Sequence, residues 1–116
     1  MYTDSNYKLY QEGYVVRMML TATIPHEPCN ALIRANKFGP IMKKILDELK
    51  PEAAYFTEMD GSRGAVLILD VSDPSKVPAM AEPFFLNFNA DCRFRICMTP
   101  ADLSKAGLDE IVKRWG

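Results

Sequence analysis

The sequence contains few of the residues from which metal and redox sites are usually built. It has one histidine, His26, and three cysteines, Cys29, Cys92 and Cys97, in 116 residues. The cysteines are odd in number and show no CxxC spacing, which argues against a disulfide framework and a zinc site. A transition-metal site needs three or four converging ligands. We therefore expect free thiols, no metal and a reducing, cytoplasmic setting.

The chain also lacks an excess of either charge and any long apolar run. Its 14 basic and 15 acidic residues give a net charge of −1, which offers no strong field for nucleic acid or an anionic membrane. No apolar stretch approaches the roughly 20 residues that span a bilayer, and the polar residues 1–13 lack the apolar segment of a secretory signal. No glycine-rich phosphate loop, dinucleotide fingerprint or Ser-His-Asp motif is present. We expect no nucleic-acid or membrane partner and no cofactor.

What is present is typical of one globular domain. The hydrophobic fraction is 48% and the charged fraction is 25%. We place a single domain at 14–116 and an N-terminal arm at 1–13, whose role stays open between a disordered segment, an expression remnant and a strap across a second subunit.

The domain reads as alternating strands and helices. Period-2 alternation, with one apolar and one mixed face, predicts a strand at 14–24, and apolar residues at helical spacing predict a helix at 28–49, kinked or divided at Gly39-Pro40. Residues 53–59 and 63–71 flank Asp60-Gly61-Ser62 as a hairpin. An irregular helix follows from 74 to about 87, capped by Asp73.

The end of the chain is predicted to be an edge strand followed by a helical tail. Residues 91–98 alternate, with Cys92, Phe94, Ile96 and Met98 expected to point inward and arginines on the other side. Thr99 opens the tail as a capping box, and Gly107 divides it. We expect Leu108, Ile111, Val112 and Trp115 to pack back onto the domain.

The segment 63–71 is apolar on both faces. Ala65, Leu67 and Leu69 alternate with Val66 and Ile68. A strand of this kind is covered on both sides, but the helices of so small a chain can cover only one. The second face is therefore predicted to meet another subunit.

The order of elements is the split βαβ pattern of ferredoxin-like α+β folds, with an antiparallel sheet and helices on one face. Residues 14–98 resemble the dimeric α/β-barrel superfamily, in which two such sheets pack face to face. "FFLNFNADCRF" followed by "MTPADL" is similar to a small branch of that superfamily without an assigned activity. The resemblance implies a homodimer. The wider group includes cofactor-independent monooxygenases, muconolactone-type isomerases, haem-degrading enzymes and domains that only bind or oligomerise, so it selects no single function.

The predicted topology brings several polar residues to one end of the sheet. They are His26, Asn30, Asp60, Arg63, Asn87, Asn89 and Asp91. Among these we predict His26 as the proton-transfer residue, because histidine titrates near neutral pH. Arg63, Asn89 and Asn30 are predicted to bind an acidic or enolisable compound.

Each of these residues also has a structural explanation. "IPHEPCN" is adequately explained as the turn from a strand into a helix that starts with Pro28, and Cys29 as a buried, inert thiol rather than a nucleophile beside His26. The methionines and phenylalanines can be core or pocket lining. Two functions follow: a small-molecule binder, including a cofactor-independent isomerase or monooxygenase with its pocket between sheet and helices, or a non-catalytic dimerisation or ligand-sensing module. Whether the chain is an enzyme stays undecided.

Overall fold

The computed structural model describes residues 15–116, so the predicted arm at 1–13 and the start of the first strand lie outside the described residues. The described chain is an α+β fold with one open, antiparallel four-stranded sheet, in the order β2-β3-β1-β4. Its strands are β1 (Val16–Ile24), β2 (Ala53–Met59), β3 (Ser62–Val71) and β4 (Asp91–Ile96). Its helices are α2 (His26–Arg34), α3 (Phe38–Leu49), α4 (Val77–Phe88), α5 (Pro100–Lys105) and α6 (Leu108–Trp115), and a short 3-10 turn η1 (Pro74–Lys76) precedes α4.

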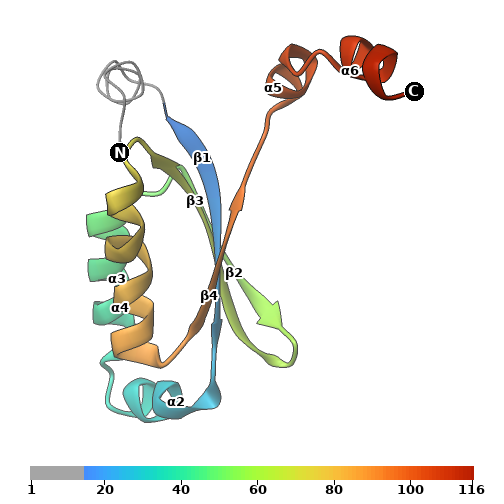
Figure 1. Cartoon of the computed structure of the whole chain (residues 1–116). Coiled ribbons are helices and arrows are strands. Elements are labelled where there is room, and N and C mark those ends of the chain that lie inside the picture. Colours follow the sequence, from blue (N-terminus) through green and yellow to red (C-terminus); the bar gives the residue numbers. More distant parts are fainter. Residues whose placement is uncertain (1–14) are drawn as a thin grey trace.

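Helices α3 and α4 stand side by side against one face of the sheet, and α2 lies across its lower end (Figure 1). The core fills the space between these layers. Its largest fully buried side chains are Phe84, Phe88, Leu20, Ile24, Leu67, Leu69 and Cys29. Phe88 lies between the rings of Phe38 and Phe84, whose centroids are 5.3 and 6.2 Å away. The expectation of helices on one face is confirmed for these two helices.

The hairpin is confirmed at the predicted place. β2 and β3 are joined by Asp60 and Gly61, both with positive φ (52° and 83°), as a two-residue turn of the primed type requires. Glycine adopts this conformation without a steric cost, and the Gly61 N–H donates to the Glu58 carboxylate at 2.9 Å.

The first helical region is divided, but not where we predicted. α2 ends before Asn36, which has a left-handed φ of 59°, and α3 begins at Phe38. Gly39 and Pro40 lie in the first turn of α3, where a proline costs no hydrogen bond because its missing N–H would have no partner in the helix. Within α2, Glu27 has extended backbone angles, so regular helical geometry starts at Pro28 as predicted.

The predicted packing of the C-terminal tail is wrong. The capping box is present, since Asp102 N–H donates to Thr99 Oγ1 and Thr99 N–H to the Asp102 carboxylate. However, α5 and α6 project away from the body at the end of β4 (Figure 1), with Leu108, Val112 and Trp115 53, 62 and 84% exposed. Ile96 and Met98, expected to point inward, are likewise exposed. We call residues 97–116 the C-terminal arm.

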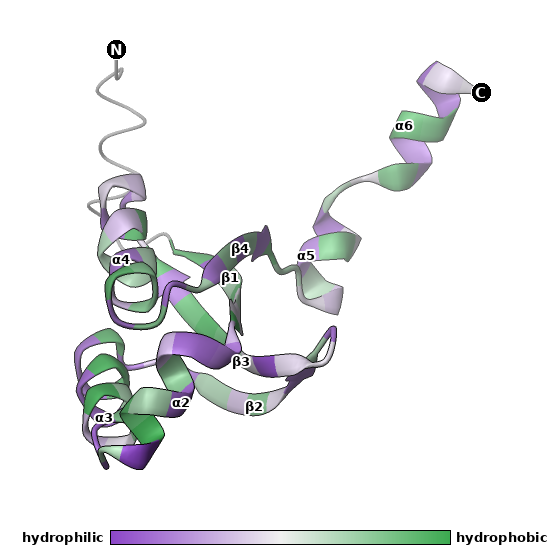
Figure 2. Ribbon diagram, turned by 90° about the horizontal axis from the view of Figure 1, so that it is seen from below, coloured by the Kyte–Doolittle hydropathy of each residue, from purple (hydrophilic) through white to green (hydrophobic). Residues whose placement is uncertain are grey.

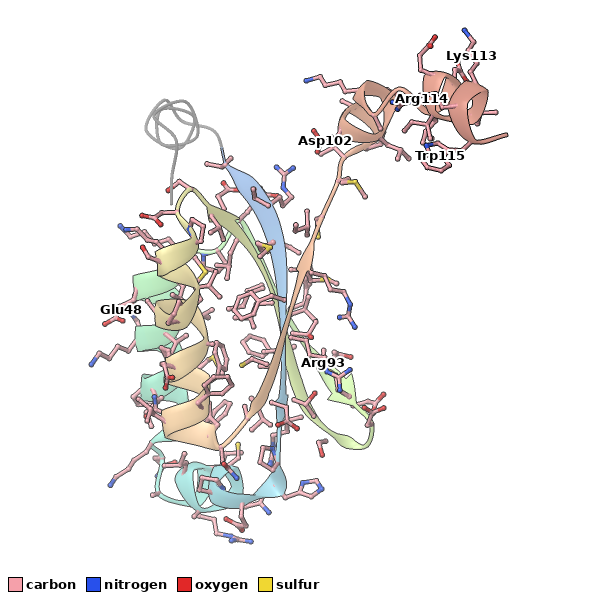
Figure 3. The ribbon with its side chains drawn as sticks, viewed as in Figure 1. Glu48, Arg93, Asp102, Lys113, Arg114 and Trp115 are labelled. Atoms are coloured by element: carbon pink, nitrogen blue, oxygen red, sulfur yellow. The ribbon has the colours of Figure 1, made fainter. Side chains whose placement is uncertain are left out.

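The strand pairing fixes which side chains share the face of the sheet opposite α3 and α4, here called the open face. Leu20, Leu67 and Phe94 point toward the helices, so their neighbours along each strand point to the open face. In Figure 3 Arg93 projects from β4 on this side, away from α3. Within residues 15–116, no helix covers the open face (Figures 1 and 2).

Candidate functional site

The structure joins two of the predicted binding residues. Arg63 lies on β3 opposite Ile24, on the side of the sheet that faces α2. Its Nη1 donates to Asn30 Oδ1 on α2 at 2.8 Å, and both residues are half-buried. Arg63 makes no ion pair with any residue in 15–116. The result is an oriented guanidinium whose charge is not balanced by a carboxylate of the described chain, an arrangement suited to a carboxylate ligand.

Cys29 adjoins this arginine but is a core residue. Its side chain is fully buried, and burial raises the pKa of the thiol, while the nearby Arg63 guanidinium acts in the opposite direction. Because burial has the larger effect, the thiol stays protonated around neutral pH and is a poor nucleophile. The buried, inert interpretation of Cys29 accounts for this environment.

His26 is the first residue of α2 and is exposed. Its ring makes no hydrogen bond with residues 15–116 and lines none of the hollows described here. Its role in proton transfer stays a prediction.

Asn89 lies between the end of α4 and the start of β4. It ends α4 with a left-handed φ of 53°, and its N–H donates to the Phe85 carbonyl, so the helix end explains its conformation. It lines a shallow hollow of about 370 Å³ together with Thr23, Pro25, Ser62, Ala90 and Asp91. Thr23 and Asp91 are cross-strand partners on the open face. Of the predicted rim, Arg63 therefore contacts Asn30, whereas Asn89 shares a hollow with Asp91 that neither Arg63 nor Asn30 lines.

Two further hollows lie on the outer surface. One, of about 470 Å³, runs between α3 and α4 and is lined by Ile41, Ile45, Leu86 and several charged residues. The other, of about 410 Å³, runs between α3 and the edge strand β2, and we call it the α3–β2 groove. Its apolar lining consists of Phe38, Met42, Leu46 and Phe56. Phe56 is 56% exposed, so the apolar lining of this groove is open to solvent.

Sequence reasoning singled out the apolar residues of the last helix but not that the structure leaves them as an exposed surface. The last helix carries Leu108, Ile111, Val112 and Trp115 at positions i, i+3, i+4 and i+7, the spacing of one apolar stripe. Figure 2 shows hydrophobic and hydrophilic bands alternating along α6, and Figure 3 places Trp115 far from the sheet. The spacing was visible in the sequence, but it indicates a buried face without indicating what buries it.

Two kinds of site find no support within residues 15–116. No group of three or more His, Cys, Asp or Glu residues in this part of the chain converges so as to hold a metal ion. None of the helices described is long and apolar enough to cross a bilayer. Comparison of the chain with protein-family models, with curated proteins and with solved structures found no match in any of the three.

Proposed function

We propose that this chain is a homodimeric module of ferredoxin-like topology, in which two copies pair through the open faces of their sheets. The observation that carries the proposal is β3. Leu67 and Leu69 are buried under the helices, whereas Val66 and Ile68, equally apolar, are only half-buried on the open face. Apolar side chains gain free energy when removed from water, at roughly 25 cal/mol per Å². A second sheet is the simplest cover for them.

The topology agrees with this interpretation. Neighbouring strands are antiparallel throughout, and the order β2-β3-β1-β4 results from two strand–helix–strand units that interleave. Two features depart from the simplest form of that fold: the first connection contains two helices, α2 and α3, and the C-terminal arm is added. Three free cysteines are consistent with a reducing compartment such as the cytoplasm.

Light scattering during gel filtration of the full chain tests the pairing. We expect twice the chain mass of 13.1 kDa at micromolar concentration. Val66→Asp places a charge at the centre of the open face and should give a monomer, because a buried unpaired carboxylate is strongly unfavourable. Leu86→Asp, at an 81% exposed position on α4, is the matched control and should remain dimeric. A monomeric wild-type chain, or a dimeric Val66→Asp variant, contradicts the proposal.

We infer a second candidate function, the binding of a small organic acid, from the oriented Arg63 guanidinium. Asn30 holds one Nη of this arginine at 2.8 Å, which leaves further N–H groups for a ligand oxygen. In this interpretation Asn89 serves a separate site, the hollow on the open face. Proton transfer by His26, as in a cofactor-independent isomerase or monooxygenase, would be an extension of the binding function.

Calorimetric titration with a panel of small mono- and dicarboxylates tests this candidate. Arg63→Met should abolish binding, and Arg34→Met, in a 76% exposed side chain on α2, should not. His26→Ala should leave affinity unchanged while removing any turnover, which separates binding from catalysis. The candidate fails if no carboxylate binds at millimolar concentration or if Arg63→Met binds equally well.

A further inference from the structure

The open face has a definite pattern of rows. Cross-strand pairing places Tyr55, Val66, Thr21 and Arg93 at one level, in the order β2, β3, β1, β4. The next level holds Ala53, Ile68, Met19 and Arg95. At these two levels the β4 edge is basic, the centre apolar, and the β2 edge carries an exposed tyrosine, while Asp91 follows one level further along β4.

This pattern distinguishes two ways of stacking the sheets by a twofold axis. An axis perpendicular to the strands, crossing β4 between Arg93 and Arg95, would place these arginines of one copy over those of the other, and like charges in contact repel. An axis parallel to the strands places β4 of each copy over β2 of the other. Arg93 then lies over the second copy's Tyr55, where a guanidinium can stack on the ring, and Met19 lies over Ile68. We therefore take the parallel axis, which keeps the β4 arginines of the two copies apart when the sheets overlap fully and places Arg93 over an aromatic ring.

The C-terminal arm follows directly from β4. Cys97 N–H still donates to the Arg17 carbonyl at 2.8 Å, after which the chain leaves the sheet. The arm then exposes the stripe of α6, with Trp115 84% accessible, and no described residue of its own chain covers it. The chain's own α3–β2 groove lies at the opposite edge of the sheet, about 14 Å away across three strand spacings.

With the parallel axis, the arm of one copy emerges beside β2 of the other. The α3–β2 groove borders that strand, and its lining is apolar and open, with Phe56 56% exposed. We propose that in the dimer each C-terminal arm crosses to the second copy and docks the apolar stripe of α6 into the α3–β2 groove of that copy. This inference rests on the proposed dimer. The exchange is reciprocal, so each copy both supplies an arm and receives one, as closed twofold symmetry requires.

The charges of α6 favour a protein groove over a lipid surface. Asp109 and Glu110 are balanced by Lys113 and Arg114, and Lys113 already pairs with Glu110 at 3.0 Å. Helices that lie on membranes usually carry an excess of Lys and Arg on the polar face. The groove is likewise flanked by an opposite pair, Lys43 and Asp47, at 2.6 Å.

Trp115 is the only tryptophan of the chain, so its fluorescence reports the environment of the arm. In the full-length dimer we expect blue-shifted emission that resists acrylamide quenching. Dilution below the dissociation constant should shift the emission to the red and raise the quenching constant several-fold. Phe56→Ser should expose Trp115 in the same way, whereas Thr57→Ser, at the next position but on the open face, should not.

Mixing experiments distinguish docking on the second copy from docking on the same chain. The Phe56→Ser chain keeps Trp115 but has a damaged groove, and the Trp115→Phe chain has an intact groove but no signal. An excess of the Trp115→Phe chain should restore protection of Trp115 in mixed dimers. If mixed dimers form without restoring protection, the arm does not exchange, and the inference is overturned.

Other outcomes separate this inference from the proposed function. A dimer by light scattering whose Trp115 remains fully quenchable overturns the arm docking but leaves the pairing of sheets intact. A blue shift that requires vesicles of phosphatidylcholine and phosphatidylglycerol, 3:1, assigns the stripe to lipid and also overturns the inference. A chain that is monomeric at all concentrations overturns both proposals.

Discussion

Replacing Ile68 by alanine should weaken the dimer by a predictable amount. Ile68 is half-buried in the single chain and lies opposite Met19 at the centre of the open face. The change removes three carbons, worth about 2.4 kcal/mol when fully buried at about 0.8 kcal/mol per methylene. About half of this contribution already comes from contacts within the chain, which leaves about 1.2 kcal/mol for the interface.

Twofold symmetry doubles this effect, because one substitution alters both copies. The expected loss is about 2.4 kcal/mol, or about a 50-fold higher dissociation constant, at about 1.4 kcal/mol for each tenfold change. Sedimentation equilibrium over a range of concentrations measures the constant directly. Urea unfolding at concentrations where both proteins are monomeric measures the loss within the chain separately.

Leu86→Ala is the control for this measurement. Leu86 is 81% exposed on α4, on the other side of the molecule from the open face. The dimer dissociation constant of the Leu86→Ala variant should therefore equal that of the wild type. A change of less than threefold for Ile68→Ala would refute the argument that the open face is the interface. An equal effect of both substitutions would show that the loss is not specific to this face.

Three further predictions concern parts of the fold with separate physical causes. Phe88→Ala should lower the free energy of unfolding by about 3–5 kcal/mol in chemical denaturation, because Phe88 is fully buried, and exposed Phe85→Ala should cost far less. Thr99→Ala removes the helix cap and should speed amide exchange throughout α5, because the cap stabilises the helix by about 1 kcal/mol. The hydrogen bonds of this cap lower the pKa of Asp102. The stabilisation by the Asp102 carboxylate is therefore complete above about pH 4 and is lost as pH falls through the lowered pKa. Burial raises the pKa of Cys92 to about 11, so the rate of Cys92 alkylation in the folded protein should still increase with pH up to about 11. The free energy of unfolding should decrease from about pH 8.5, where the thiol of the unfolded chain ionises. Alkylation that levels off at about pH 8.5 would contradict this.

The sheet could be predicted from the sequence because its signals are local. Alternation located β1 and β4, and Asp60-Gly61 between two short strand-like segments located the hairpin of β2 and β3. The division of the first helical region was harder. Gly39-Pro40 looks like a helix break, but a proline in the first turn is tolerated, and the true end of α2 is set by the left-handed Asn36, which composition alone does not reveal.

The candidate site could be predicted only in part. The predicted strand order shows which residues lie at the same end of the sheet, but it does not show on which face of the sheet each side chain lies. The topology correctly suggested which end of the sheet would hold Arg63 and Asn30, and the hydrogen bond joins them. It did not show that Asn89 shares a hollow with Ser62 and Asp91 rather than with Arg63. Ser62 and Arg63 are adjacent in β3 and point in opposite directions, so a difference of one position decides which of them joins Asn89.

The surface against which the C-terminal arm packs could not be predicted from the sequence either. A stripe at i, i+3, i+4 and i+7 predicts that one side of a helix is buried, and for α6 the nearest surface along the chain was the obvious choice. The wrong prediction of packing on the same domain and the proposed docking on a second copy rest on the same four residues, Leu108, Ile111, Val112 and Trp115. Two features distinguish these two kinds of packing: the direction in which the C-terminal arm leaves β4, and the position of the α3–β2 groove at the far edge of the sheet. Both are properties of the assembled fold, so the partner of an amphipathic helix has to be inferred from the tertiary structure.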